Sequence, residues 1–241
     1  MPFLKSRPAR RCDPALRRPR AAVWCARVLL LLTLAGAAGF TAAAGTVLVL
    51  GDSLSAGYGL PAGQGWVDLL SRKMAQTHPG FKVVNASISG ETTFGGVGRL
   101  PDLLRTHTPA VVVIELGAND GLRGTDIALT RDNLRRLARD SLAAGARPLL
   151  VGMRIPPNYG PAYTRQFAAL FAEVARETGA ATVPFLLDGI AEHRELFQDD
   201  GIHPSPAAQP RMLDNVLPHL LPMLSPSRRA APKPPGRTRL P

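Results

Sequence analysis

Ser53, Asp200 and His203 are the residues whose types and spacing could perform covalent catalysis. Ser53 lies in GDSLSAG, directly after an apolar run, where its hydroxyl could project from a strand end as a nucleophile. His203 follows Asp200 by three residues, so this carboxylate could reach Nδ1 and leave Nε2 to accept a serine proton. Asp199 is the alternative orienting acid, but it would have to face the opposite way. The pattern predicts acyl transfer, although Asp52 or Ser53 could instead only cap a helix.

Two further positions offer hydrogen-bond donors to the oxyanion of a tetrahedral intermediate. Gly90 in SISGE has no side chain to obstruct its N–H, and Asn119 in GAND carries a side-chain amide. Each also has a commonplace explanation. Gly90 could serve a turn that needs positive φ, and Asn119 could cap a loop.

These residues need a framework that brings distant segments together. Apolar runs alternate with stretches of helical periodicity, which is the signature of βαβ units and a parallel sheet. The predicted strands are Thr46–Leu50, Lys82–Ala86, Ala110–Leu116, Arg147–Arg154 and Ala181–Phe185. The predicted helices are Trp66–Gln76, Gly96–Arg105, Ile127–Ala144, Tyr163–Thr178 and Ala207–Leu224. The pattern favours an α/β fold, namely a three-layer α/β/α sandwich with a flavodoxin-like, five-stranded parallel sheet.

Four polar, glycine-bearing loops are expected to meet at one edge of this sheet. Three of them follow predicted strands and one lies near the C-terminus: GDSLSAG, NASISGET, ELGANDGLRG and DDGIHPS. Ligands of such sheets gather outside the carboxyl ends of the strands. With these blocks in this order, the sequence resembles the SGNH (GDSL) hydrolase family from about Thr46 to Leu224.

The resemblance implies both a site and a reaction. Ser53 would be the nucleophile, His203 the general base and Asp200 its orienting acid, with oxyanion donors from Ser53, Gly90 and Asn119. Relatives of this type accept acyl-CoA-type thioesters, lysophospholipids and small aryl or alkyl esters, and an acyl-enzyme forms on the serine. We expect no cofactor, and the sequence has no clustered His and Cys residues with metal-ligand spacing.

The sequence departs from the family pattern at Gly59, at Ala118, where a second glycine is expected, and in a basic tail. Leu122 and Tyr159 are the predicted substrate-binding residues. Residues 121–124, GLRG, predict a loop with a hinge at each end, whose leucine could cover an acyl chain; a simple polar turn is an equal alternative. Residues 154–163, which include Tyr159, are expected to form the opposite wall.

The net charge of +11 invites a nucleic-acid interpretation, but the excess lies outside the predicted domain. Residues 1–44 hold 8 basic and 1 acidic residues, and residues 225–241 hold 5 basic and no acidic ones. The intervening segment keeps 16 basic against 17 acidic residues, so it has no excess from which to build a phosphate-binding groove. We therefore expect no nucleic-acid partner.

The two ends of the chain differ from its body. Residues 1–44 combine arginines, an apolar run and small residues, which is the order of a secretory signal cut near Ala44. The 17 residues 28–44 could instead remain as a membrane anchor. Residues 225–241, rich in Pro and Arg, predict a disordered tail. We expect a periplasmic or secreted monomer with a hydrolase domain at 45–224 and no stable membrane span after cleavage.

Three alternative functions remain at this stage. A carbohydrate O-acetylesterase of the same superfamily would prefer short acetyl groups. A flavodoxin-like nucleotide or phosphate-binding module would need a Gly-rich phosphate loop, which GDSLSAGYG does not match. A surface-exported structural protein would need no converging polar loops.

Overall fold

The computed structural model describes residues 44–224. The predicted signal segment, apart from its last residue, and the predicted basic tail lie outside the described residues. No helix within 44–224 combines the length and the apolar character needed to cross a membrane.

Five parallel strands form a single sheet in the order β2-β1-β3-β4-β5. The strands are β1 (Gly45–Gly51), β2 (Phe81–Asn85), β3 (Val111–Glu115), β4 (Arg147–Val151) and β5 (Ala181–Val183). All five residues of β3 are buried, as expected for a central strand covered on both faces. In the register of β1 against β3, Gly51 lies opposite Glu115, so the two strands end at the same level.

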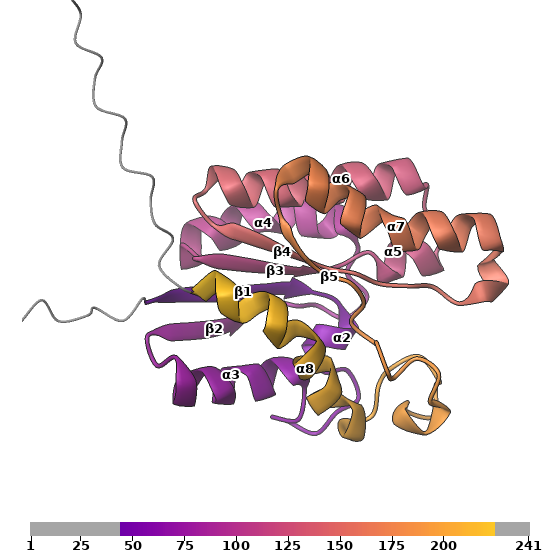
Figure 1. Ribbon diagram of the computed structural model, residues 1–241, viewed down its shortest axis with the longest axis horizontal. Helices are drawn as coiled ribbons and strands as arrows, with labels where there is room; N and C mark the ends of the chain where they lie inside the picture. Colours follow the sequence, from indigo (N-terminus) through magenta and orange to yellow (C-terminus); the bar gives the residue numbers. More distant parts are fainter. Residues whose placement is uncertain (1–43, 225–241) are drawn as a thin grey trace, which may run out of the picture. The chain divides into compact units, whose positions relative to one another are not determined.

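Helices cover both faces of the sheet. They are α2 (Ser53–Ala56), α3 (Trp66–Thr77), α4 (Thr93–His107), α5 (Ala118–Leu122), α6 (Ile127–Ala143), α7 (Pro161–Thr178) and α8 (Gln209–Leu220). Short 3-10 turns are η1 (Pro157–Tyr159), η2 (Arg194–Leu196), η3 (Pro206–Ala208) and η4 (Leu221–Leu224). α3 and α8 pack together below the sheet, and α4, α6 and α7 pack together above it (Figure 1). The predicted three-layer α/β/α sandwich is confirmed.

The element boundaries differ from the predicted ones where backbone chemistry intervenes. β5 ends at Val183 because Pro184, which has no N–H to donate, follows it. α4 begins at Thr93, three residues earlier than predicted, because the Thr92 hydroxyl caps the N–H of Gly95 at 3.2 Å. α2 and α5, of four and five residues, were not predicted because they are too short to show helical periodicity.

The carboxyl edge of the sheet is where the elements of interest gather. α2 follows β1 directly, and α5 begins three residues after the end of β3. Both short helices lie at the same end of the sheet in Figure 1, together with the loop that leads into α8. The fold therefore brings residues near positions 53, 119 and 203 to one edge, as the topology requires.

Candidate active site

Ser53, His203 and Asp200 form one hydrogen-bonded chain at this edge. Nε2 of His203 lies 3.0 Å from Oγ of Ser53, although the two residues are 150 positions apart in the sequence. Nδ1 of the same ring lies 2.6 Å from Oδ2 of Asp200. Because Ser53 is the first residue of α2, its hydroxyl stands where the chain turns from strand to helix. These contacts bring the three predicted catalytic residues together.

The Asp200 carboxylate is held by its own loop. Its Oδ1 accepts hydrogen bonds from the backbone N–H groups of Ile202, at 2.9 Å, and His203, at 3.0 Å. The N–H and the ring of His203, followed by the N–H of Ile202, lower the pKa of Asp200 to about 2. Asp200 is therefore ionised at neutral pH and can orient the imidazole. The side chains of Asp200 and His203 remain 39% and 19% exposed, so the pair faces solvent.

Asp199, the alternative orienting acid, is turned elsewhere. Its backbone carbonyl accepts a hydrogen bond from the guanidinium of Arg194 at 2.9 Å, and its carboxylate makes no hydrogen bond within the described part of the chain. The same guanidinium also donates to the carbonyl of Gln198 at 2.8 Å. Arg194 thus braces the base of the loop, and Asp200 is the acid that contacts His203.

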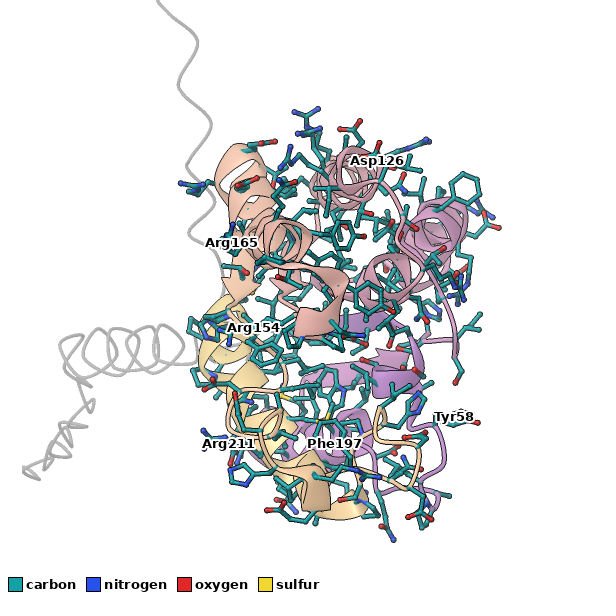
Figure 2. All side chains as sticks on the ribbon, turned by 90° about the vertical axis from the view of Figure 1, so that its right-hand side faces the viewer. Tyr58, Asp126, Arg154, Arg165, Phe197 and Arg211 are labelled. Carbon is teal, nitrogen blue, oxygen red and sulfur yellow. The ribbon has the colours of Figure 1, made fainter. Side chains whose placement is uncertain are left out.

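A second brace, which was not predicted, ties this loop to the segment DSLSAGY that follows β1. Nε2 of Gln198 donates to the carbonyls of Tyr58, at 2.9 Å, and Pro204, at 3.2 Å. The Tyr58 ring packs on the His203 ring with centroids 4.5 Å apart. Figure 2 looks onto this edge, with Tyr58 projecting beyond the ribbon.

Gly59, one of the departures from the family pattern, makes this brace possible. Its φ of +72° favours glycine, and a Cβ at this position would lie 2.2 Å from Oε1 of Gln198. The glycine therefore leaves room for the Gln198 amide beneath the Tyr58 carbonyl. The departure from the family pattern at Gly59 thus permits a contact between segments 140 residues apart.

The predicted oxyanion donors lie on neighbouring loops. Gly90 adopts φ +81°, so the turn explanation is correct, and its carbonyl accepts a hydrogen bond from Arg123 at 3.1 Å. Within residues 44–224, the backbone N–H groups of Gly90 and Ser53 have no protein acceptor. Nδ2 of Asn119 donates to Oδ2 of Asp52 at 3.1 Å and to the carbonyl of Glu91 at 3.0 Å. The amide is therefore fixed with its NH2 group toward the GDS turn.

The Ala118 departure does not disturb Asn119. Gly117, just before it, adopts φ +119°, and a Cβ there would lie 3.2 Å from the Phe171 ring. Ala118 is the first residue of α5, a position that any helix former can occupy. The backbone thus needs the first glycine of this block and not a second one.

Two carboxyl groups lie buried beneath the serine, at Asp52 and Glu115, whose residues are 1% and 0% exposed. Oδ1 of Asp52 caps the N–H of Leu54 at 3.0 Å, so the capping explanation holds for this aspartate. Oε2 of Glu115 accepts from Oγ of Ser55 at 2.7 Å and, at 3.4 Å, from the N–H of Asp52.

Burial is the largest cause of the pKa shifts of Asp52 and Glu115. It raises the pKa of Asp52 to about 6, against the opposing effect of the Leu54 N–H. Burial, followed by the neighbouring Asp52 charge, raises the pKa of Glu115 well above its usual range. Glu115 was not predicted as a site residue, although an acid near the end of the apolar run VVVIEL is a visible signal.

Leu122 and Tyr159, the predicted substrate-binding pair, contact each other. The Tyr159 hydroxyl donates to the carbonyl of Leu122 at 2.8 Å, and Tyr163 from the same segment donates to Thr125, also at 2.8 Å. The predicted loop with two hinges is wrong, because residues 121 and 122 belong to α5. Gly121 is buried, and a Cβ there would lie 2.7 Å from Ile155, so it packs rather than hinges.

Side chains that can bind metal ions do not gather into a site in the described part of the chain. Within residues 44–224, no group of three or more His, Cys, Asp and Glu side chains is arranged to hold a metal ion.

Comparison with known proteins places this geometry in context. Esterase TesA of Pseudomonas aeruginosa is 51% identical over 183 residues, which cover 76% of this chain and 91% of the relative. Thioesterase 1/protease 1/lysophospholipase L1 of Escherichia coli K12 is 44% identical over 184 residues, covering 76% and 87%.

Solved structures of esterases are also similar to this chain. The crystal structure of TesA matches with a TM-score of 0.72 at 50% identity, covering 74% of this chain and 99% of that one. A psychrotrophic esterase, EstA from a Pseudoalteromonas species, inhibited by monoethylphosphonate, matches with a TM-score of 0.71 at 42% identity, covering 75% and 98%. An acetyl-xylooligosaccharide esterase from Geobacillus, at 21% identity and a TM-score of 0.62, is similar in fold alone.

The family model for GDSL-like lipases and acylhydrolases matches residues 49–210, which include the serine, the oxyanion candidates and the aspartate–histidine loop. On this match and on the identity to its relatives, the chain belongs to the GDSL-like lipase/acylhydrolase family.

Proposed function

We propose that Ser53 carries the ester-hydrolase activity of this chain through an acyl-enzyme intermediate. The observation that supports it is the continuous contact from Oγ of Ser53 through the His203 ring to Asp200, with distances of 3.0 and 2.6 Å. A serine hydroxyl is a weak nucleophile until an adjacent base accepts its proton, and this contact supplies that base.

The reaction follows from these positions. Oγ of Ser53 attacks the carbonyl carbon of an ester or thioester while its proton passes to Nε2 of His203. The C–O or C–S bond then breaks, and the leaving group takes the proton from Nε2. Water repeats the sequence on the acyl-enzyme, which releases the acid and restores the serine hydroxyl. The ionised Asp200 stabilises the imidazolium that forms in both halves.

The tetrahedral oxyanion needs donors that are in place before it forms. The N–H groups of Ser53 and Gly90, which have no protein acceptor among residues 44–224, are two of the proposed donors. The Asn119 amide is the third. Both of its hydrogens are engaged, by Asp52 and by the Glu91 carbonyl, so it must share one of them with the substrate oxygen.

Apolar acyl groups are the proposed substrates. Tyr58, Ile88 and Ile202 are large exposed apolar side chains on three of the loops that carry site residues. The names of the relatives include esterase, thioesterase and lysophospholipase, which are acyl-transfer activities of this kind. We propose that acyl thioesters, lysophospholipids and aryl or alkyl esters are hydrolysed, with Leu122 and Tyr159 in the wall beside the site. Rates on p-nitrophenyl acetate and on longer acyl esters separate this proposal from an O-acetylesterase, which would prefer acetate.

The test of the nucleophile is covalent labelling. A fluorinated alkyl phosphonate should modify the wild-type protein, with the mass shift mapped to the peptide that contains Ser53. Ser53→Ala should lose both the label and the hydrolysis of p-nitrophenyl esters while keeping its melting temperature. Ser205→Ala is the matched control, since that hydroxyl is buried without a hydrogen-bond partner in the described part of the chain and lies two residues from His203. Labelling at another residue, or turnover by Ser53→Ala, would refute the assignment.

We further propose that the enzyme is exported and acts as a monomer in the periplasm or outside the cell. The support is the order of charged, apolar and small residues in positions 1–44, followed at residue 45 by the first strand of the domain. N-terminal sequencing of protein recovered from the periplasm should begin near Gly45, and light scattering should give the mass of one chain. An intact N-terminus in the membrane fraction would indicate an anchor instead.

A further inference from the structure

The acid pair beneath the nucleophile, Asp52 and Glu115, makes no ion pair with a Lys or Arg side chain within residues 44–224. The charged groups that act on Asp52 are Glu115 and, when protonated, His203. Among other nearby acids, Asp120 on α5 is bonded to Thr93, and Glu91 pairs with Arg99 at 2.9 Å. Two ionised carboxylates in contact and away from water would repel strongly, so such pairs hold one proton between them.

The hydrogen bonds decide which group carries that proton. The two oxygens of Asp52 each accept an N–H, Oδ1 from Leu54 and Oδ2 from Asn119. Donors of this kind stabilise a carboxylate. Glu115 differs, because Oε2 accepts from Ser55 while the fully buried Oε1 has no donor within residues 44–224. Oε2 of Glu115 also lies 3.4 Å from the backbone N of Asp52. Besides the burial that raises both pKa values, the neighbouring Glu115 side chain lowers the pKa of Asp52, whereas the Asp52 side chain raises the pKa of Glu115, as expected when Glu115 carries the proton.

We propose that Glu115 stays a neutral carboxylic acid that donates its proton to the Asp52 carboxylate, and that Asp52 in turn fixes the Asn119 amide with its NH2 group toward the site. Glu115 is thus a positioning residue, separated from the oxyanion by two residues, Asp52 and Asn119. The inference rests on the proposed role of Asn119 as an oxyanion donor.

The fold reserves space for this acid. Gly51 lies opposite Glu115 in the register of β1 and β3, and a Cβ at Gly51 would lie 2.9 Å from Oε2 of Glu115 and 2.7 Å from Cβ of Ser55. The glycine before the GDS aspartate therefore lets a glutamate from the neighbouring strand reach under the turn. An apolar residue at 115 would fill the space but leave Asp52 without its donor.

The first arm of the test compares Glu115→Gln with Glu115→Leu. The glutamine amide can donate to Asp52 and accept from Ser55, so this variant should keep kcat within about threefold of wild type. The leucine variant should lower kcat about tenfold with little change in KM, which is less than the loss of a whole oxyanion donor. In an Asn119→Ala background, the Glu115→Leu change should cost almost nothing further, because its effect passes through that amide.

The second arm does not depend on activity. An infrared difference spectrum of wild type against Glu115→Gln at pH 7.5 should show the C=O band of a buried protonated carboxylic acid. Absence of that band would overturn the proposal, as would equal losses of kcat in folded Glu115→Gln and Glu115→Leu. If the leucine variant does not fold, the glutamine variant and the spectrum still decide the question. Failure of Ser53 labelling would refute the proposed function instead and leave the band unchanged.

Discussion

The active edge holds acids in two contrasting environments, one in an exposed loop and one under the nucleophile. Asp200 is 39% exposed in its side chain and has its pKa lowered to about 2. Asp52 is buried and has its pKa raised to about 6, and the pKa of the neighbouring, fully buried Glu115 is also raised well above its usual range. The same functional group thus shifts in opposite directions in two parts of one site.

Hydrogen-bond donors and access to water, more than residue type, set the charge of these acids. Asp200 has two N–H donors and an imidazole beside it, with solvent on the remaining side. Oε2 of Glu115 accepts from the Ser55 hydroxyl and, at 3.4 Å, from the Asp52 N–H. Its Oε1 has no donor within residues 44–224, and the residue has no water-facing surface. The exposed acid is suited to holding a transient positive charge, whereas the buried pair is suited to holding a fixed geometry.

The largest effect should come from the exposed acid. Asp200→Asn should reduce kcat on p-nitrophenyl esters about 10⁴-fold, because the amide no longer fixes the tautomer or stabilises the imidazolium. Asp199→Asn is the matched control and should behave like wild type, since only the backbone carbonyl of that residue is engaged. Similar losses in both variants would mean that the wrong acid has been assigned.

The second largest loss of activity should come from Asn119, whose amide is hydrogen-bonded to Asp52 of the buried pair. Asn119→Ala should lower kcat about 10²–10³-fold, the usual cost of one oxyanion donor, while KM changes little. Steady-state kinetics on an aryl ester measures both constants. A rise in KM with kcat unchanged would show that Asn119 binds the ground state and would separate the buried pair from the chemistry.

The brace of the exposed loop should have a smaller effect. Gln198→Ala removes the contacts with the Tyr58 and Pro204 carbonyls and should lower kcat about fivefold, as expected for one or two net hydrogen bonds. Gly59→Ala should give a similar loss, because its Cβ would displace the same side chain. The double variant should be no worse than the more severe single one. The carboxylic acid band assigned to Glu115 should be unchanged in all three, because the buried pair does not depend on this loop.

The smallest effect concerns the pH dependence of stability, which has opposite signs for the buried Glu115 and the exposed Asp200. Glu115 prefers its protonated form in the folded state, so its contribution is full below its unfolded value of about 4.5 and is lost as pH rises toward the folded pKa. The melting temperature of wild type should therefore fall relative to Glu115→Gln as pH rises from about 4.5 toward the raised pKa of folded Glu115. Asp200, with its lowered pKa, contributes above about pH 4 and loses that contribution as pH falls through about 2. A parallel pair of curves for wild type and Glu115→Gln would argue against a retained proton.

Much of the fold and the catalytic chain could be predicted from local sequence. Apolar runs gave five strands, and their polar ends placed the triad at one edge, because parallel topology leaves little choice. The spacing of Asp200 and His203 was local and therefore visible. Gly90 and Asn119, predicted from the polar loops, lie on neighbouring loops at this edge, and their role as oxyanion donors stays a prediction.

What sequence could not supply depends on contacts between distant segments. Gln198 reaches the Tyr58 carbonyl across 140 positions, and no local pattern reports that distance. Glu115 was hidden in an apolar strand, because a run of that kind predicts burial but does not say which polar partner lies across it. The hinged loop predicted for residues 121–124 was wrong because a five-residue helix has no measurable periodicity, whereas the substrate-binding role of Leu122 stays a prediction.

Because Ser53 and His203 are 150 positions apart, the proposed hydrolysis requires most of the domain to be folded. Ser53 directly follows β1 and His203 comes after β5, so four strands of the sheet lie between them in the chain. On the proposed mechanism, Ser53 stays inert until the loop that carries His203 docks, so recovery of turnover after denaturation should report when this edge of the sheet closes.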